Sequence, residues 1–248
     1  MESNAMESIV PEMEAPFHIR QETAHAPMTG RLTMLQSAQR RISSIRYALL
    51  KRVLDIVVAS IAIVVLFPLG LTIAICIRLT SPGPIFYSER RVGRFGIPFV
   101  IFKFRSMYTK EYLEGVLRVD MTESLLARRR TFGKDSADPR ITPIGNFLRK
   151  WSLDELPQFL NVLLGEMSLV GPRPIVAAER DLYGASGRYY DLAVPGISGL
   201  WQVSGRSDIS FSERVVLDCM YAADWSLLRD VSILARTFSA VVQKKGAY

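Results

Sequence analysis

The stretch 138–174, DPRITPIGNFLRKWSLDELPQFLNVLLGEMSLVGPRP, carries the adjacent carboxylates Asp154 and Glu155. The pattern of apolar residues predicts helix from Ile141 to Leu164, which places the pair within or beside a helix. Three arginines surround the pair: Arg140, Arg149 and Arg173. Carboxylates among guanidinium groups, with no histidine nearby in the sequence, indicate phosphate chemistry assisted by a metal ion.

The composition points to anionic partners. The chain has 248 residues, about half of them apolar, with a formal net charge of +7 and a pI of about 9.6. A chain this basic prefers phosphates, acidic lipids or nucleic acid.

The cysteines and histidines exclude several kinds of site. Cys76 lies inside an apolar run, so Cys76 and Cys219 do not indicate a disulfide framework. The only histidines, His18 and His25, lie near the start of the sequence. With no Cys/His cluster at zinc spacing, a metal is expected to have oxygen ligands, as Mg²⁺ does. Proton carriers and nucleophiles must then be Asp, Glu, Lys, Tyr, Ser or water.

An uncharged apolar run of 22 residues, Ile56–Ile77, is long enough to cross a bilayer. Pro68 interrupts it near the centre, and proline inside a helix bends the axis. Both flanks are basic, with Lys51 and Arg52 before the run and arginines after it, and basic residues stay on the cytoplasmic side. The pattern favours a re-entrant helix over two alternatives, a kinked spanning helix and a buried helix of a soluble core.

Asp55 lies at the entrance to this apolar run. We expect its carboxylate to pair with Lys51 or Arg52, or with the helix N-terminus.

The remaining segments predict an α-rich α/β (α+β) fold with little sheet. We expect short strands at Ile85–Tyr87 and Phe99–Phe102 around a basic turn, a charged helix with loops over 108–135, and a glycine-rich loop over 193–206. Two amphipathic helices are predicted at 211–221 and 225–242. The predicted domains are a disordered tail (1–45), a re-entrant membrane helix (46–80) and a cytoplasmic catalytic domain (81–248) whose amphipathic helices lie at the membrane interface.

The carboxylate pair itself has two interpretations. Ser152-Leu-Asp-Glu155 fits a capping box, in which Glu155 caps a helix start and does no chemistry. Alternatively, a helix N-terminus is a favourable place for a phosphate, with one carboxylate facing the reacting phosphorus and its neighbour binding a metal.

Cationic side chains near turns support the second interpretation. A single arginine is usually a surface charge, but several of them bounded by glycine or proline fit a pyrophosphate site, since guanidinium groups bind phosphate oxygens bidentately. The candidates for binding phosphate are Lys103, Arg105, Arg149, Arg173 and Arg206.

Ordered motifs over residues 48–243 resemble those of the bacterial sugar transferase family. The motifs are Lys51-Arg52-x-x-Asp55, Ser81-Pro-Gly-Pro with Arg91-x-Gly, Lys103-Phe-Arg-Ser-Met, Asp138-Pro-Arg-Ile-Thr, Ser152-Leu-Asp-Glu-Leu-Pro-Gln, Asn161-Val-Leu, Gly165-x-Met-Ser-Leu-Val-Gly-Pro-Arg-Pro, Pro195-Gly-Ile-x-Gly and Gln202-Val-x-Gly-Arg206. The resemblance implies a monotopic enzyme of the bacterial cytoplasmic membrane, with its catalytic domain on the cytoplasmic face. Such enzymes move a hexose-1-phosphate from a UDP-sugar, here UDP-glucose or UDP-galactose, to undecaprenyl phosphate.

The same resemblance implies roles for individual residues. Asp154 would be the nucleophile that forms a covalent phosphosugar intermediate, and Asp154 and Glu155 would hold Mg²⁺. Arg149 and Arg173 match family arginines near the phosphates. Gln202 and Arg206 match the loop on the nucleotide side.

A non-enzymatic alternative remains open at this point. A membrane-anchored adaptor could bind acidic lipids or nucleic acid through its basic face, and it would need the arginines but not the carboxylate pair. The transferase interpretation expects membrane lipids and no nucleic acid as partners, and the membrane helix and C-terminal helix offer surfaces for a homo-oligomer.

Overall fold

A long apolar helix dominates the start of the computed structural model, which describes residues 45–116, 138, 140–205 and 209–242. This helix, α2, spans Ile45–Thr80 and contains Pro68. An 18-residue window within its part Ala48–Thr80 has a mean hydropathy of 2.7, and α2 is the only helix of the described residues that is long and apolar enough to cross a membrane. Only 11% of that apolar window is buried, unlike the core helix of a soluble protein.

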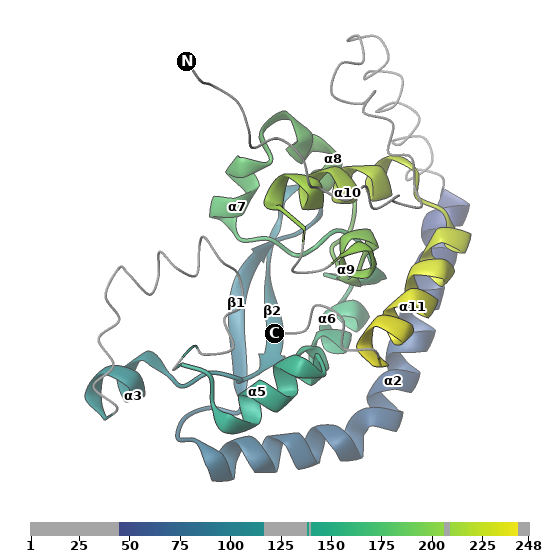
Figure 1. The fold of residues 1–248 in the computed structure, drawn as a ribbon. Coiled ribbons are helices and arrows are strands. Elements are labelled where there is room, and N and C mark those ends of the chain that lie inside the picture. Colours follow the sequence, from purple (N-terminus) through teal and green to yellow (C-terminus); the bar gives the residue numbers. More distant parts are fainter. Residues whose placement is uncertain (1–44, 117–137, 139, 206–208, 243–248) are drawn as a thin grey trace, which may run out of the picture.

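The two halves of α2 pack on different parts of the molecule. Ala59, in the first half, belongs to a core cluster with Val162 and Leu169. Ile77, in the second half, packs in another cluster with Leu148. The ribbon changes direction between the halves (Figure 1).

The predicted hairpin is confirmed. Strands β1 (Phe86–Val92) and β2 (Pro98–Phe104) pair antiparallel, with Phe86 opposite Phe104 and Val92 opposite Pro98. The turn between them, η2 (Arg94–Gly96), is a single 3-10 turn.

The segment 141–164 is helical in broken form. It contains α5 (Pro143–Lys150), the single 3-10 turn η3 (Leu153–Glu155) and α6 (Gln158–Leu164). Thr142 begins α5 by accepting a hydrogen bond from the Gly145 N–H at 2.9 Å. The break falls at the carboxylate pair.

The prediction of a glycine-rich loop over 193–206 is wrong in part. Strand β4 (Gly196–Ser198) pairs in parallel with β3 (Ser168–Val170), and helix α9 (Leu200–Ser204) follows. The two backbones meet at Gly171 and Gly196, where a Cβ atom on Gly196 would lie 2.0 Å from the Gly171 nitrogen. Glycine is needed at this crossing because no other residue leaves enough space.

The remaining helices cover the upper part of the hairpin and the first half of α2 (Figure 1). They are α7 (Ala177–Leu182), the turn η4 (Gly184–Ser186), α8 (Gly187–Leu192), α10 (Phe211–Ala223) and α11 (Leu227–Val242). The last two confirm the predicted C-terminal helices. The short α3 (Lys110–Gly115) begins the charged segment, whose continuation lies outside the described residues.

The described residues therefore form a mostly helical fold with two small two-stranded sheets, as the sequence predicted. The predicted tail, except for Ile45, lies outside the described residues.

Candidate active site

The carboxylate pair lies in a sharp turn between α5 and α6. Ser152, just before the pair, has φ 55° and ψ 23°, a left-handed conformation that is rare for residues other than glycine. Asp154 and Glu155 then form the 3-10 turn η3, and α6 starts only at Gln158. Strained backbone of this kind is often retained at functional sites.

The capping-box interpretation is wrong. The Ser152 side chain makes no capping hydrogen bond, because an N-cap residue needs extended backbone and Ser152 is left-handed. Glu155 instead forms an ion pair with Lys103 of β2, with 2.7 Å between Lys103 Nζ and Glu155 Oε1. The two side chains are 23% and 31% exposed, so the pair is open to a ligand from solvent.

Asn161 holds β2 beside the carboxylate pair. Its fully buried side chain accepts a hydrogen bond from the Phe102 N–H at 3.1 Å and donates one to the Val100 carbonyl at 2.7 Å. Asn161 thus bonds to β2 as a neighbouring strand would, and it fixes Lys103 relative to Glu155. Sequence reasoning gave this residue no role, although an asparagine inside an apolar helix was a signal for one.

Arg149 lies in the last turn of α5, on the side of Asp138 and Arg140. The Arg140 guanidinium donates hydrogen bonds to both carboxylate oxygens of Asp138, with Arg140 Nε 2.8 Å from Oδ1 and 3.0 Å from Oδ2. Burial raises the pKa of the Asp138 carboxyl, but the hydrogen bonds from Arg140 and the charges of Arg140 and Arg149 outweigh it and leave the pKa below its usual value. Asp138 is therefore a fixed negative charge that orients Arg140 and lies close enough to Arg149 to feel its charge.

The guanidinium of Arg105 is bonded to the turn after α2. It donates to the Ser81 carbonyl at 2.8 Å and the Ser81 hydroxyl at 2.9 Å, and also to the Pro82 carbonyl. Arg105 is only 4% exposed. This geometry gives it a structural role in the turn after α2, and it does not support the predicted contact with phosphate.

A second group of charges surrounds Trp201 on α9. The guanidinium carbons of Arg173 and Arg214 lie 5.4 Å and 5.1 Å from the centre of its ring. Buried Asp218 accepts a hydrogen bond from the Tyr183 hydroxyl at 2.8 Å. Gln202 is the next residue on α9, whereas Arg206 lies outside the described residues.

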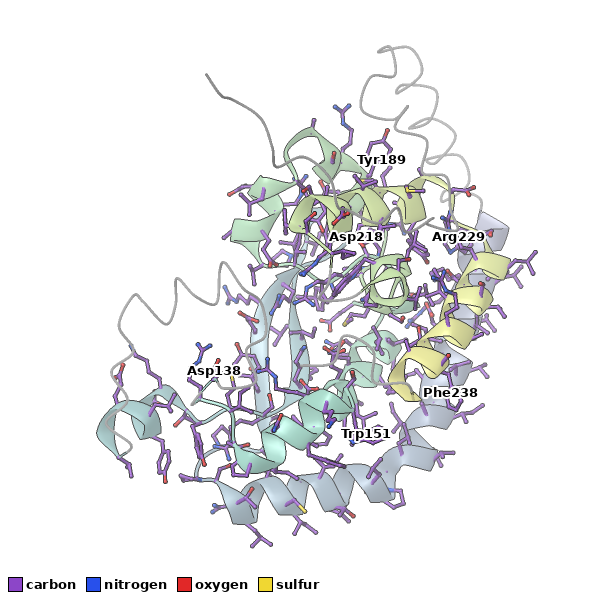
Figure 2. All side chains as sticks on the ribbon, in the orientation of Figure 1. Asp138, Trp151, Tyr189, Asp218, Arg229 and Phe238 are labelled. Atoms are coloured by element: carbon purple, nitrogen blue, oxygen red, sulfur yellow. The ribbon has the colours of Figure 1, made fainter. Side chains whose placement is uncertain are left out.

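The two groups lie toward opposite ends of the hairpin, as Asp138 and Asp218 show in Figure 2. Ile175, two residues after Arg173, pairs with Val92 of β1 in an isolated β-bridge. Val92 in turn lies opposite Pro98, the first residue of β2. Lys103, beside Glu155, lies five residues further along β2, roughly 16 Å away. Direct contacts join Lys103 to the carboxylate pair, whereas Arg173 and Gln202 form part of the separate group.

Asp218 gives the second group a pH dependence. Burial raises the pKa of Asp218 to about 7, despite the hydrogen bond from Tyr183 and the nearby charges of Arg173 and Arg214, which lower it. The folded protein thus holds this proton more tightly than the unfolded chain, where the value is 3.8. The resulting stabilisation is complete below pH ~3.8 and is lost as the pH rises to ~7.

Asp218→Asn is therefore expected to stabilise the protein at pH 8 by on the order of 2 kcal/mol, and by clearly less at pH 5. Asparagine resembles the neutral carboxyl and still accepts the bond from Tyr183. Chemical denaturation in detergent at both pH values measures the difference. Exposed Asp181 supplies the control variant, Asp181→Asn, and an equal effect of Asp218→Asn at both pH values would contradict the assignment.

The entrance residues of α2 tie the apolar helix to the rest of the protein, but only partly as expected. Lys51 pairs with Asp230 of α11 at 2.6 Å, and Arg52 donates to the Val162 and Leu163 carbonyls at the end of α6. Asp55 accepts hydrogen bonds from the Ser168 hydroxyl and the Leu169 N–H, each at 3.0 Å. The charge of Lys51 acts on Asp55, as expected, but the hydrogen bonds of Asp55 come from Ser168 and Leu169, partners on another element that the local sequence does not reveal.

Comparison with known proteins agrees with these motifs. The model of the family described as "Bacterial sugar transferase" matches residues 46–244. The exopolysaccharide production protein ExoY of Rhizobium meliloti is 39% identical over 247 residues, which cover 98% of this chain and 100% of ExoY.

Two other relatives have more specific names. The UDP-galactose-lipid carrier transferase of Erwinia amylovora is 48% identical over 204 residues, 80% of this chain and 42% of that protein. The UDP-glucose:undecaprenyl-phosphate glucose-1-phosphate transferase of Caulobacter vibrioides is 40% identical over 208 residues, 80% of this chain and 72% of that protein. The chain thus spans less than half of the Erwinia protein but all of ExoY. The matched region contains both the apolar helix and the carboxylate pair, and the chain belongs to the bacterial sugar transferase family.

Proposed function

We propose that this protein transfers a hexose-1-phosphate from a UDP-sugar, UDP-glucose or UDP-galactose, to undecaprenyl phosphate and releases UMP. The observation that carries the proposal is the family match over residues 46–244, which includes the partly exposed carboxylate pair beside Lys103. The names of the Erwinia and Caulobacter relatives supply both sugars and the lipid acceptor. The reaction would begin the assembly of an exopolysaccharide or another glycoconjugate on the membrane.

The proposed chemistry proceeds in two displacements at one phosphorus. A carboxylate oxygen of Asp154 attacks the phosphorus that bears the sugar, and the bond from that phosphorus to the oxygen shared with the other phosphate breaks, so UMP leaves with the bonding electrons. A phosphate oxygen of undecaprenyl phosphate then attacks the same phosphorus and releases the Asp154 carboxylate. A covalent intermediate divides one difficult transfer between anions into two easier steps.

The carboxylate pair also suits Mg²⁺ as a cofactor. No cluster of three or more His, Cys, Asp or Glu residues occurs in the part of the chain that the structure describes. Mg²⁺ does not need such a cluster, since it commonly takes one or two carboxylates together with substrate phosphates. Asp154 and Glu155 would hold it, and it would supply neutralisation of phosphate charge. Lys103 keeps the Glu155 carboxylate in place, and Arg149, in the helix before the pair, would bind phosphate oxygens, whereas Arg173 lies in the separate group around Trp201.

We also propose that α2 enters and leaves the cytoplasmic leaflet of the bacterial cytoplasmic membrane. Large apolar side chains are exposed on α2 and on neighbouring α11, including Val64, Phe67, Leu228 and Phe238. Both ends of α2 are basic, with Lys51 and Arg52 at one end and Arg78 at the other. Because basic residues stay on the cytoplasmic side, this charge pattern favours placing both ends of the helix on that side of the membrane. A membrane-impermeant thiol reagent should reach cysteines placed at Leu49 and at Thr80 only after the cells are opened, in a variant without Cys76 and Cys219. Labelling of one end in intact cells would instead show a spanning helix.

A panel of nucleotide sugars tests the function. The purified chain, undecaprenyl phosphate and Mg²⁺ are mixed with each donor, and lipid-linked sugar and nucleoside monophosphate are measured. UDP-glucose or UDP-galactose should give lipid product and UMP in equal amounts, and removing Mg²⁺ with EDTA should lower the rate at least about tenfold. The proposal fails if no donor yields a lipid-linked sugar phosphate.

Lys103→Met is expected to lower kcat by about tenfold to a hundredfold, the effect of losing one charge-assisted hydrogen bond next to the reacting group. Protein stability should change by no more than about 1 kcal/mol, because the ion pair is partly exposed. Steady-state kinetics and denaturation measure the two effects. The matched control is Lys110→Met, which removes the exposed pair with Glu114 and should leave kcat unchanged. Equal kcat in both variants would remove Lys103 from the site.

A further inference from the structure

A cavity of about 300 Å³ opens at the start of α2. Its walls come from the first turns of α2, the hairpin turn η2, the chain after α8 and the end of α10. Apolar side chains make up much of the lining, among them Leu192 and Trp225. Lys51, Arg52 and Arg94 supply positive charge.

The cavity is separate from the carboxylate pair. Gly165, in its wall, follows the C-terminal end of α6, whereas Glu155 precedes the N-terminal end. Their positions differ by ten residues, which corresponds to roughly 15 Å along a helix. A ligand in the cavity therefore cannot be the phosphate that reacts at Asp154.

Arg94 is the cation best placed to bind an anion in the cavity. Lys51 is already bonded to Asp230, Tyr221 and the Val170 carbonyl, and Arg52 is bonded to the end of α6. Arg94 donates through Nε to the Leu192 carbonyl at 3.0 Å. Its two terminal nitrogens make no hydrogen bond within the described residues, so they remain available to a ligand.

The local charge is positive. Lys51 and Asp230 neutralise each other, and Asp55 balances only one of the two arginines, Arg52 and Arg94. Burial lowers the pKa of the Arg94 guanidinium, so an anion beside it would offset the cost of burying its charge. An anionic ligand is thus preferred over a neutral one.

The position of the cavity indicates an amphipathic ligand. Ala48, in the first turns of α2, lines the cavity. The next residues along α2, Leu49 and Leu50, are exposed apolar side chains of the kind that enter a bilayer. The cavity therefore lies where charged side chains of α2 meet its exposed apolar surface, at the level expected for lipid head groups if α2 is in the membrane as proposed above.

We propose that this cavity binds one anionic phospholipid, with its phosphate at Arg94 and the first part of an acyl chain on the apolar wall. The bound lipid would be a non-reacting partner that fixes α2, the hairpin turn and α10 relative to one another. The proposal rests on the membrane association proposed above, but not on the transfer reaction.

Binding of dioctanoyl phosphatidylglycerol to the full chain in detergent tests the proposal, with dioctanoyl phosphatidylcholine and inorganic phosphate as comparison ligands. Phosphatidylglycerol should bind saturably and more tightly than either comparison ligand. Ala48→Trp, which fills the cavity, and Arg94→Gln should each weaken its binding by about tenfold or more. Leu49→Trp adds the same ring to the neighbouring position outside the cavity and should bind like the wild type.

Each other outcome is decisive. Equal binding of the two lipids shows that the anionic head group is not recognised, and binding of phosphate as tight as that of the lipid shows a free-anion site; either result overturns the proposal. So does unchanged binding in Ala48→Trp and Arg94→Gln. Transfer activity, assayed separately without added phospholipid, should be the same in Ala48→Trp and wild type, so a protein that binds lipid but lacks transferase activity would refute only the proposed function.

Discussion

Asp154→Asn is expected to lower the rate of sugar-phosphate transfer by about a thousandfold or more while the protein still folds and associates with membranes. Asparagine keeps the shape of the side chain in the turn η3 but lacks the anionic oxygen that attacks phosphorus. The measurements are lipid-product formation and the mass of protein quenched in acid after brief exposure to the UDP-sugar. Wild-type protein should gain the mass of one hexose phosphate, and the variant should gain none.

Asp181→Asn is the matched control, since Asp181 is exposed on α7 and should tolerate the change with full activity. The experiment also separates the transferase from a basic membrane adaptor. An adaptor would bind acidic lipids or nucleic acid equally well in the wild type and in the Asp154→Asn variant, and its binding would weaken steeply with salt. Full activity in Asp154→Asn, with no adduct on the wild-type protein, would refute the covalent mechanism.

Local patterns predicted those parts of the fold that depend on local contacts. The apolar helix has a long uncharged apolar run, the hairpin has two short runs of β-favouring residues around a turn, and the two C-terminal helices have a periodic pattern of apolar residues. The pairing of β3 with β4 joins segments almost thirty residues apart, and each strand has only three residues. A strand that short has no periodicity to detect, so Pro195-Gly-Ile-Ser198 resembled a loop.

The candidate site shows the same limit. The sequence identified Asp154, Glu155 and Lys103, and the structure brings Lys103 onto Glu155. It misassigned the local geometry because the capping-box pattern does not reveal that Ser152 is left-handed. A charged residue near glycine or proline can equally bind a ligand or a buried carbonyl. Arg105 does the latter, and only its burial in the fold distinguishes the two roles.

Asp230→Asn is expected to lower the free energy of unfolding by roughly 3–5 kcal/mol, because it leaves a largely buried ammonium without its counter-charge. Asp230 is 1% exposed and accepts three hydrogen bonds: from Lys51 at 2.6 Å, Tyr221 at 2.7 Å and Trp225 at 3.0 Å. These bonds join α2, α10 and α11. Guanidinium denaturation in detergent, followed by tryptophan fluorescence, measures the loss.

The matched control is Asp224→Asn, which removes an ion pair with Arg229 on the same side of the fold. The Asp224 carboxylate is 72% exposed, so its loss should change stability by no more than about 1 kcal/mol. Combining Asp230→Asn with Lys51→Met should recover part of the loss, since no buried charge is then left without a partner. If Asp230→Asn behaves like Asp224→Asn, the attachment of α11 to the apolar helix depends on apolar packing and not on this network.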